Sequence, residues 1–201
     1  MELSRLKDDL SEVGSGSLRM DVYDNVTSLQ SIQADWDRFI EDCESDIYLT
    51  VDWLAIWWEF YGRGTFRAYV IRKEAEIIAA LPLLIDRVGL PPFAARVARL
   101  VGSDSTISVF SLPVKPDYSN AVINKVAEQL FCVEKCDCVS FSPLSGETVF
   151  AQRETWSDIK SDLFAIESFE ETGPQTIYLM PETFEEHFAG LKKSHRKNCR
   201  S

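Results

Sequence analysis

The chain has 201 residues, 45% of them apolar and 26% charged, which is the composition of a globular domain with a sizeable core. A formal net charge of −11 argues against general nucleic-acid binding, which requires a basic face. The charge is uneven, because residues 192–201 carry five Lys or Arg side chains and no acid, whereas the first 191 residues carry 16 basic and 32 acidic ones. Such asymmetry is typical of an interaction surface or a tail.

Features of export and of membrane insertion are missing from the sequence. The first twenty residues alternate charged and apolar side chains and do not resemble a signal peptide. The longest apolar run, 77–85, has nine residues and is too short to cross a bilayer. The five cysteines are odd in number, so we expect reduced thiols in a cytoplasmic protein. Cys132, Cys136 and Cys138 match no usual zinc spacing, and no metal is expected.

The first third of the chain predicts a short tail, a strand and a helix. Residues 1–17 are weakly helical and then rich in Gly and Ser, which indicates a flexible N-terminal segment. Residues 18–23 are a strand candidate. A helix is predicted from Thr27 or Ser28 to Cys43, because apolar side chains recur there at helical spacing.

An aromatic stretch, 48–62, reads YLTVDWLAIWWEFYG and predicts a helix with Thr50 as N-cap and Gly62 or Gly64 at its end. Its apolar side chains form two adjoining stripes, Trp53, Ile56, Trp57 and Phe60 on one and Leu54, Trp58 and Tyr61 on the other. Only two acidic residues interrupt them, so we expect this helix to be buried nearly all round. The simpler interpretation is a core helix. The alternative is an aromatic wall of a ligand cleft, which makes Trp57 a candidate substrate-binding residue.

After Gly64 the hydrophobic period changes from 3.6 to 2, which indicates strands. Residues 66–70 and 77–85 predict a hairpin with its turn at 73–76, and 96–101 a further strand. Asp104 lies in the polar loop that follows, and loops at strand ends often carry function. It is therefore a second candidate substrate-binding residue, the alternative being an Asx-type turn.

The remaining predicted elements alternate strands and helices, so the fold class is α/β or α+β. They are strands at 107–112, 139–144, 163–169 and 176–180, helices at 118–131 and within 147–159, and a last helix from Pro181 with Thr183 and Glu186 spaced as a capping box. The last helix ends in a basic cluster in which Lys193, Arg196 and Lys197 are candidates for cofactor phosphates. A solvated helix end that complements its own dipole is the alternative.

The usual catalytic signatures are absent from the sequence. It contains no G-x-S-x-G elbow, no phosphate loop of the G-x-x-x-x-G-K-[ST] type and no G-x-G-x-x-G turn. The two histidines, His187 and His195, are two helical turns apart and too distant to ligate one ion together, so a solvated helix face is expected. No catalytic residue is assigned.

The order of several apolar signposts resembles the first half of the GNAT-like acyltransferases of the CelD/BcsL family, named for cellulose biosynthesis. The signposts are Trp36, the aromatic series Tyr48, Trp53, Trp57, Trp58 and Phe60, the segments Ala79-Ala80-Leu81-Pro82-Leu83 and Leu100-Val101-Gly102-Ser103-Asp104, and the junction Tyr178-Leu179-Met180-Pro181 followed by a basic helix. The resemblance covers about residues 20–200.

This resemblance implies a GNAT-like mixed β-sheet flanked by helices over 18–180, with 181–201 as the first helix of a truncated acetyltransferase domain. It implies an N-acyltransferase that moves an acyl group from acyl-CoA, its co-substrate, to an amine or sugar-linked acceptor such as a polysaccharide precursor. We expect the chain to be a fragment, inactive alone, because the family's acyl-CoA loop lies mostly after this junction. The alternative is a non-catalytic module that binds a substrate or a protein partner, for example through the basic C-terminal helix.

Overall fold

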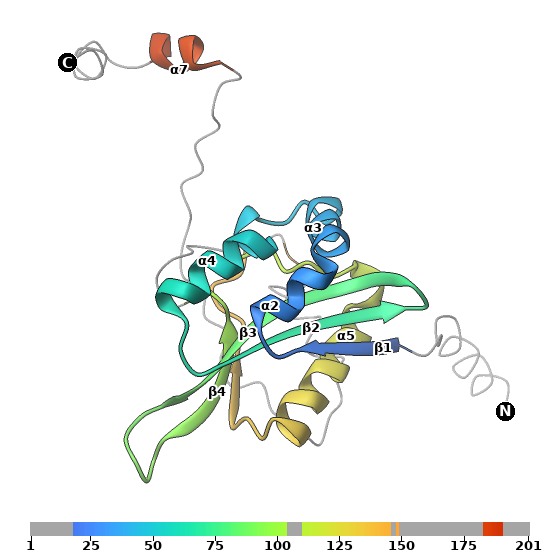
Figure 1. Ribbon diagram of the computed structural model, residues 1–201, viewed down its shortest axis with the longest axis vertical. Helices are drawn as coiled ribbons and strands as arrows, with labels where there is room; N and C mark the ends of the chain where they lie inside the picture. Colours follow the sequence, from blue (N-terminus) through green and yellow to red (C-terminus); the bar gives the residue numbers. More distant parts are fainter. Residues whose placement is uncertain (1–17, 104–109, 146–147, 149–182, 191–201) are drawn as a thin grey trace, which may run out of the picture. The chain divides into compact units, whose positions relative to one another are not determined.

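The computed structural model describes residues 18–103, 110–145, 148 and 183–190 (Figure 1). The chain forms two compact units, Met1–Phe169 and Glu170–Ser201, which are described separately. The predictions for residues 1–17, the helix within 147–159 and the strands at 163–169 and 176–180 lie outside the described residues, as does the first half, 107–109, of the predicted strand at 107–112. The second half of that strand is not found, because Phe110 forms only an isolated bridge with Leu144 and residues 111 and 112 belong to no strand. The division into domains at 17 and 180 stays a prediction.

A five-stranded mixed sheet forms the centre of the first unit, with its strands in the order of the sequence. The strands are β1 (Leu18–Tyr23), β2 (Thr65–Lys73), β3 (Glu76–Val88), β4 (Ala95–Leu100) and β5 (Cys138–Ser140). Neighbours among β1 to β4 are antiparallel, whereas β5 runs parallel to β4. The predicted mixed sheet flanked by helices is confirmed, and each predicted strand from 18 to 101 is found within a few residues of its expected bounds.

Strand β3 is the most buried element, because the nine residues of its apolar run, 77–85, are all buried. A continuous run rather than an alternating one is typical of a strand covered on both faces. The predicted turn before it is tight, and Glu74 adopts a positive φ of 55° there although no glycine is present. After β4 the chain returns to β3, where Val114 forms a bridge with Ala79.

One face of the sheet is covered by α2 (Val26–Leu29), α3 (Gln33–Asp42) and α4 (Val51–Tyr61), which Figure 1 shows along the same side. The prediction of one helix starting at Thr27 or Ser28 was wrong in two respects. The helix starts earlier, because the Asn25 side chain caps it by accepting from the Ser28 N–H at 2.7 Å. A 3₁₀ turn at Gln30–Ile32 then separates α2 from α3.

The start of α4 is held by other contacts than predicted. Thr50 occupies the N-cap position, but its hydroxyl donates to the Ile47 carbonyl instead of capping the helix. The Asp37 carboxylate of α3 accepts from the Val51 N–H at 2.9 Å, so α3 caps α4. Gly62 ends the helix as predicted.

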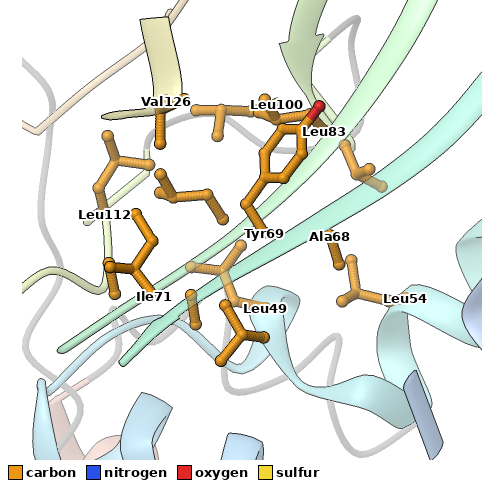
Figure 2. Close-up of a cluster of buried hydrophobic side chains, with 14 of the residues drawn as sticks. Leu49, Leu54, Ala68, Tyr69, Ile71, Leu83, Leu100, Leu112 and Val126 are labelled. Atoms are coloured by element: carbon orange, nitrogen blue, oxygen red, sulfur yellow. The ribbon is translucent and has the colours of Figure 1, made fainter. Parts of the chain in front are cut away.

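The opposite face is covered by α5 (Ser119–Glu128) and the π-helical turn Gln129–Val133 that continues it. Figure 2 shows Tyr69 on the side of the sheet that faces Val126 of α5, and Ala68 on the side that faces Leu54 of α4. Because α5 crosses over the sheet, it returns the chain to start β5 in the direction of β4. Strand β5 is shorter than the predicted 139–144, and Leu144 forms only an isolated bridge with Phe110.

In the second unit the structure describes one helix, α7 (Phe184–Gly190). The Glu186 N–H donates to the Thr183 hydroxyl at 3.2 Å, which is the N-terminal half of the predicted capping box.

We predict that Trp57→Ala lowers the free energy of unfolding by about 3–5 kcal/mol, because it empties the site of an indole buried in the hydrophobic core. Denaturant unfolding of both proteins measures the change. The matched control is Phe60→Ala on the exposed side of the same helix, which should change stability by no more than about 0.5 kcal/mol. Equal losses in the two variants would contradict the burial pattern.

Candidate functional site

Helix α4 has a buried side and an exposed apolar side, contrary to the prediction that it is buried nearly all round. Trp57 is 2% exposed, whereas Ile56 is 59% and Phe60 72% exposed. These three residues were predicted to face inward together. The reason is geometric: apolar residues occupy most of the helix circumference, but only the side that carries Val51, Leu54 and Trp57 is buried in the core.

The aromatic rings of this region form one connected cluster. Trp57 stacks on Trp53 with ring centroids 6.5 Å apart and contacts Tyr61 at 5.9 Å. Tyr48 meets the edge of Trp53 at 5.4 Å, and Trp58 packs on Phe66 of β2. Trp57 is therefore the buried centre of the cluster. A substrate would touch the solvent-facing rings around Trp57 rather than Trp57 itself. Its role in substrate binding stays a prediction.

The carboxyl ends of β4 and β5 lie at one edge of the sheet, because these two strands are parallel. In open α/β sheets such an edge is where ligands usually bind. Gly102, with φ of 89°, turns the chain out of β4, and Pro143 follows β5. Asp104, the candidate in this loop, lies just outside the described residues, as do Lys193, Arg196 and Lys197. The described residues therefore do not bring the predicted site residues together.

The sequence resemblance implies acyl-CoA as co-substrate, and the N–H groups at a helix start are suited to bind its pyrophosphate. In the described part of the sheet, the helix that follows β4 is α5. The residues present do not fit the pyrophosphate. Pro116 has no N–H, and Asp117 adds a carboxylate to the turn directly before the helix. The Ser119 hydroxyl is engaged with the Pro116 carbonyl at 2.8 Å. A phosphate here would face negative charge rather than a glycine-rich cradle, so the described crossover helix provides no pyrophosphate site.

Two arginine–carboxylate groups, missed by the sequence analysis, lie on the two faces of the sheet. On the α5 face, Glu134 binds Arg67 Nε at 2.5 Å and Arg96 Nη2 at 3.3 Å. On the α4 face, Asp86 lies 3.4 Å from Arg63 and 3.9 Å from Arg99. The partners are far apart in the sequence. The only signal was the alternation in β2, which places Arg67 on the face opposite Phe66.

Tyr69 and Cys136 complete the group on the α5 face. Tyr69 is fully buried, and its hydroxyl has no hydrogen-bond partner in the part of the chain that the structure describes. Burial, with the Glu134 carboxylate nearby, raises the pKa of Tyr69. Burial also raises the pKa of the Cys136 thiol, although Arg96 opposes this. Both groups therefore stay neutral at neutral pH, and the cluster holds the sheet to α5 rather than supplying an acid or a base.

Within the described ranges, no three His, Cys, Asp or Glu side chains are close enough together to hold a metal ion. Nor is any of the helices described there both long and apolar enough to span a bilayer.

Comparison with known proteins gives similarity in structure alone, since no family model and no curated protein sequence matches the chain. An aminoglycoside acetyltransferase from an uncultured soil metagenomic sample, crystallised with trehalose, is 13% identical with a TM-score of 0.49 over 85% of this chain and 100% of that one. A GCN5-related N-acetyltransferase from Ralstonia eutropha JMP134 is 11% identical with a TM-score of 0.39 over 78% of this chain and 100% of that one.

We predict that Glu134→Gln lowers the free energy of unfolding by about 2–3 kcal/mol, because Arg67 and Arg96 lose their shared carboxylate. This loss of stability is smaller than the loss expected when a fully buried ion pair is broken, because the Arg96 side chain is 32% exposed. Glu76→Gln is the control. Glu76 pairs with Lys115 but is 63% exposed, so its loss should be at most about 1 kcal/mol. Indistinguishable losses by denaturant unfolding would contradict the importance of Glu134.

We also predict that Tyr69→Phe makes the protein more resistant to alkali. The folded-state pKa of Tyr69 is raised, so the stability from its neutral phenol is complete below the unfolded pKa of about 10 and is lost as the pH rises above it. Tyr69→Phe has no phenol to ionise and does not lose this stability. The free energy of unfolding of the variant minus that of the parent should therefore rise between about pH 10 and 11.5, by up to ~1.4 kcal/mol per pH unit. Unfolding curves at each pH measure it, with Tyr61→Phe correcting for the removal of one hydroxyl. A constant difference across that range would refute the prediction.

Proposed function

We propose that this chain is the acceptor-side part of a GNAT-type N-acyltransferase of the CelD/BcsL kind. The donor would be an acyl-CoA, and the acceptor a small amine or a sugar-linked amine such as a polysaccharide precursor. The observation that carries the proposal is the chain topology: four antiparallel strands, a crossover helix, and a fifth strand parallel to the fourth. The aromatic signposts of the resemblance lie on the elements that build this sheet and its α4 cover.

The parallel pair is the part of this topology that can serve transfer chemistry. It aligns the ends of β4 and β5 at one edge, and this edge is where we propose that the acceptor is oriented. Trp57 and Asp104 are the proposed acceptor-side residues, Trp57 by supporting the aromatic surface. Lys193, Arg196 and Lys197 are the proposed contacts for CoA phosphates, through charge alone.

Catalysis is not assigned to this chain by itself. The start of α5 does not fit a pyrophosphate, and Tyr69 and Cys136 on the α5 face stay protonated near neutral pH, so neither can act there as a general base. We therefore propose that the 201 residues do not turn over acyl-CoA.

A non-catalytic binding module is the second candidate function. The exposed apolar side of α4 favours it, because a contiguous apolar patch on a surface is typical of a contact with another molecule.

The proposal predicts weak, salt-sensitive CoA binding without turnover. The purified chain is incubated with acetyl-CoA and a panel of amines and amino sugars, and free thiol is followed. Titration calorimetry with CoA at low and high salt runs in parallel. We expect no thiol release above the uncatalysed rate, and CoA binding that disappears by about 0.5 M salt, where exposed charges are screened.

Two triple variants that remove the same charge test whether the basic cluster is the site of CoA binding. Replacing Lys193, Arg196 and Lys197 by Ala should abolish the low-salt binding, whereas replacing the exposed Arg19, Arg38 and Lys135 should leave most of it. Thiol release above background, or micromolar binding that persists at high salt, would show a complete site and overturn the statement on turnover. An absence of CoA binding at low salt would remove the support for an acyltransferase and favour the binding module.

A further inference from the structure

The hairpin of β3 and β4 extends beyond the other strands of the sheet. Its last two residue pairs, Arg87–Arg96 and Val88–Ala95, lie past the ends of the pairing with β2 and with β5. Figure 1 shows this end of the hairpin projecting from the sheet, and residues 87–93 are all exposed. Residues 88–95, which close the hairpin, are here called the hairpin tip.

The hairpin tip contains no polar side chain. Its sequence is VGLPPFAA, whereas surface turns usually contain Asn, Asp or Ser beside Gly and Pro. Leu90 is 82% exposed and Phe93 is 89% exposed. Two large apolar side chains that are exposed together cost free energy in water, so we expect another molecule to cover them.

The backbone of the hairpin tip has few free hydrogen-bond donors. Pro91 and Pro92 have no N–H, and the Phe93 N–H donates to the Leu90 carbonyl at 2.8 Å. This hydrogen bond closes the turn and holds Leu90 and Phe93 close together. A free N–H is costly where no water can solvate it, so a turn with this backbone is suited to an apolar medium.

The exposed apolar area is small for a contact with a folded protein. Leu90 and Phe93 together expose roughly 300 Å², taking 150–250 Å² for a whole aromatic side chain and somewhat less for leucine. A specific protein interface buries about 800 Å² on each partner. A lipid bilayer needs no such complementary surface, because lipids rearrange around a narrow projection whose apolar side chains enter by about 5–10 Å.

We propose that the hairpin tip docks reversibly on a phospholipid bilayer, with Leu90 and Phe93 inserted at the boundary between headgroups and acyl chains. Arg87 lies three residues before Leu90, about 10 Å back along the hairpin. Its guanidinium has no carboxylate partner among the described residues, and at that depth it would meet the lipid phosphates. The inference does not depend on the proposed enzymatic function, since it uses only the β3–β4 hairpin.

The charge of the chain decides which vesicles test this contact. The net charge is −11, so an anionic surface repels the chain as a whole, and one arginine does not offset this. Zwitterionic phospholipids also carry the phosphate that Arg87 would meet. The basic cluster within 192–201 would instead require anionic lipid, and its binding would be lost at high salt. Zwitterionic vesicles at high salt therefore isolate the hairpin tip.

Sedimentation of the chain with phosphatidylcholine vesicles at about 0.1–10 mM lipid tests the docking. The bound fraction should rise with lipid, and the partition coefficient should be the same at about 0.1 and 0.5 M salt. Leu90→Ser combined with Phe93→Ser should lower that coefficient at least tenfold, because the inserted apolar area is removed. The control combines Ile56→Ser with Phe60→Ser on α4, two side chains that are 59% and 72% exposed, and should leave the coefficient unchanged.

A fluorescence experiment tests the insertion without relying on a loss of binding. The emission of Phe93→Trp, after subtraction of the parent chain with its five tryptophans, should be quenched by lipids brominated on their acyl chains. The emission of Phe60→Trp should not be quenched.

Three results would overturn the proposal. The first is no binding to phosphatidylcholine at 10 mM lipid, or a Phe93→Trp emission that brominated lipids leave unchanged. The second is binding that needs phosphatidylglycerol and disappears at high salt, which would assign the contact to the basic cluster. The third is binding that survives the double change in the hairpin tip but is lost in the α4 control, which would place the contact on α4.

Discussion

The architecture depends on covering β3 on both faces. Nine consecutive apolar residues of this strand are buried, and a strand of that kind is stable only when each face is closed by other elements. The helices α2, α3 and α4 close one face, and α5 closes the other (Figure 1). The crossover helix that supplies the second cover also forces β5 to run parallel to β4. The sheet edge of functional interest is therefore a consequence of the need to bury β3.

The two covers are attached in different ways. Helix α4 is joined to the sheet by apolar and aromatic packing, with Trp58 against Phe66 and Leu54 near Ala68 (Figure 2). On the α5 side a carboxylate, Glu134, at the end of the π-helical turn binds two strand arginines. A buried carboxylate with two directed partners specifies position more strictly than apolar contact does, although it adds less net stability than its Coulomb energy implies. The π-helical turn aims Glu134 at these arginines.

The aromatic cluster of α4 is involved in both candidate functions, the acyltransferase part and the non-catalytic binding module. Its buried half, centred on Trp57, makes the helix a rigid part of the sheet packing. Its exposed half leaves apolar rings in solvent, where they cost free energy unless another molecule covers them. An acceptor, a partner or a second copy of the chain would each relieve that cost.

Sequence periodicity alone was enough to identify the strands from β1 to β4, the helices α4 and α5 and the start of α7, because local propensities, caps and apolar spacing all agree there. It was not enough to decide which side of α4 is buried. An apolar arc covering most of a helix gives no preferred inward direction, and only the assembly of the core selects Trp57 over Ile56 and Phe60. The Arg67–Glu134–Arg96 group was also beyond sequence reasoning, since its members meet only when the sheet and α5 have assembled. Local pattern therefore determined the elements, and long-range packing decided which side chains they bury and which they present.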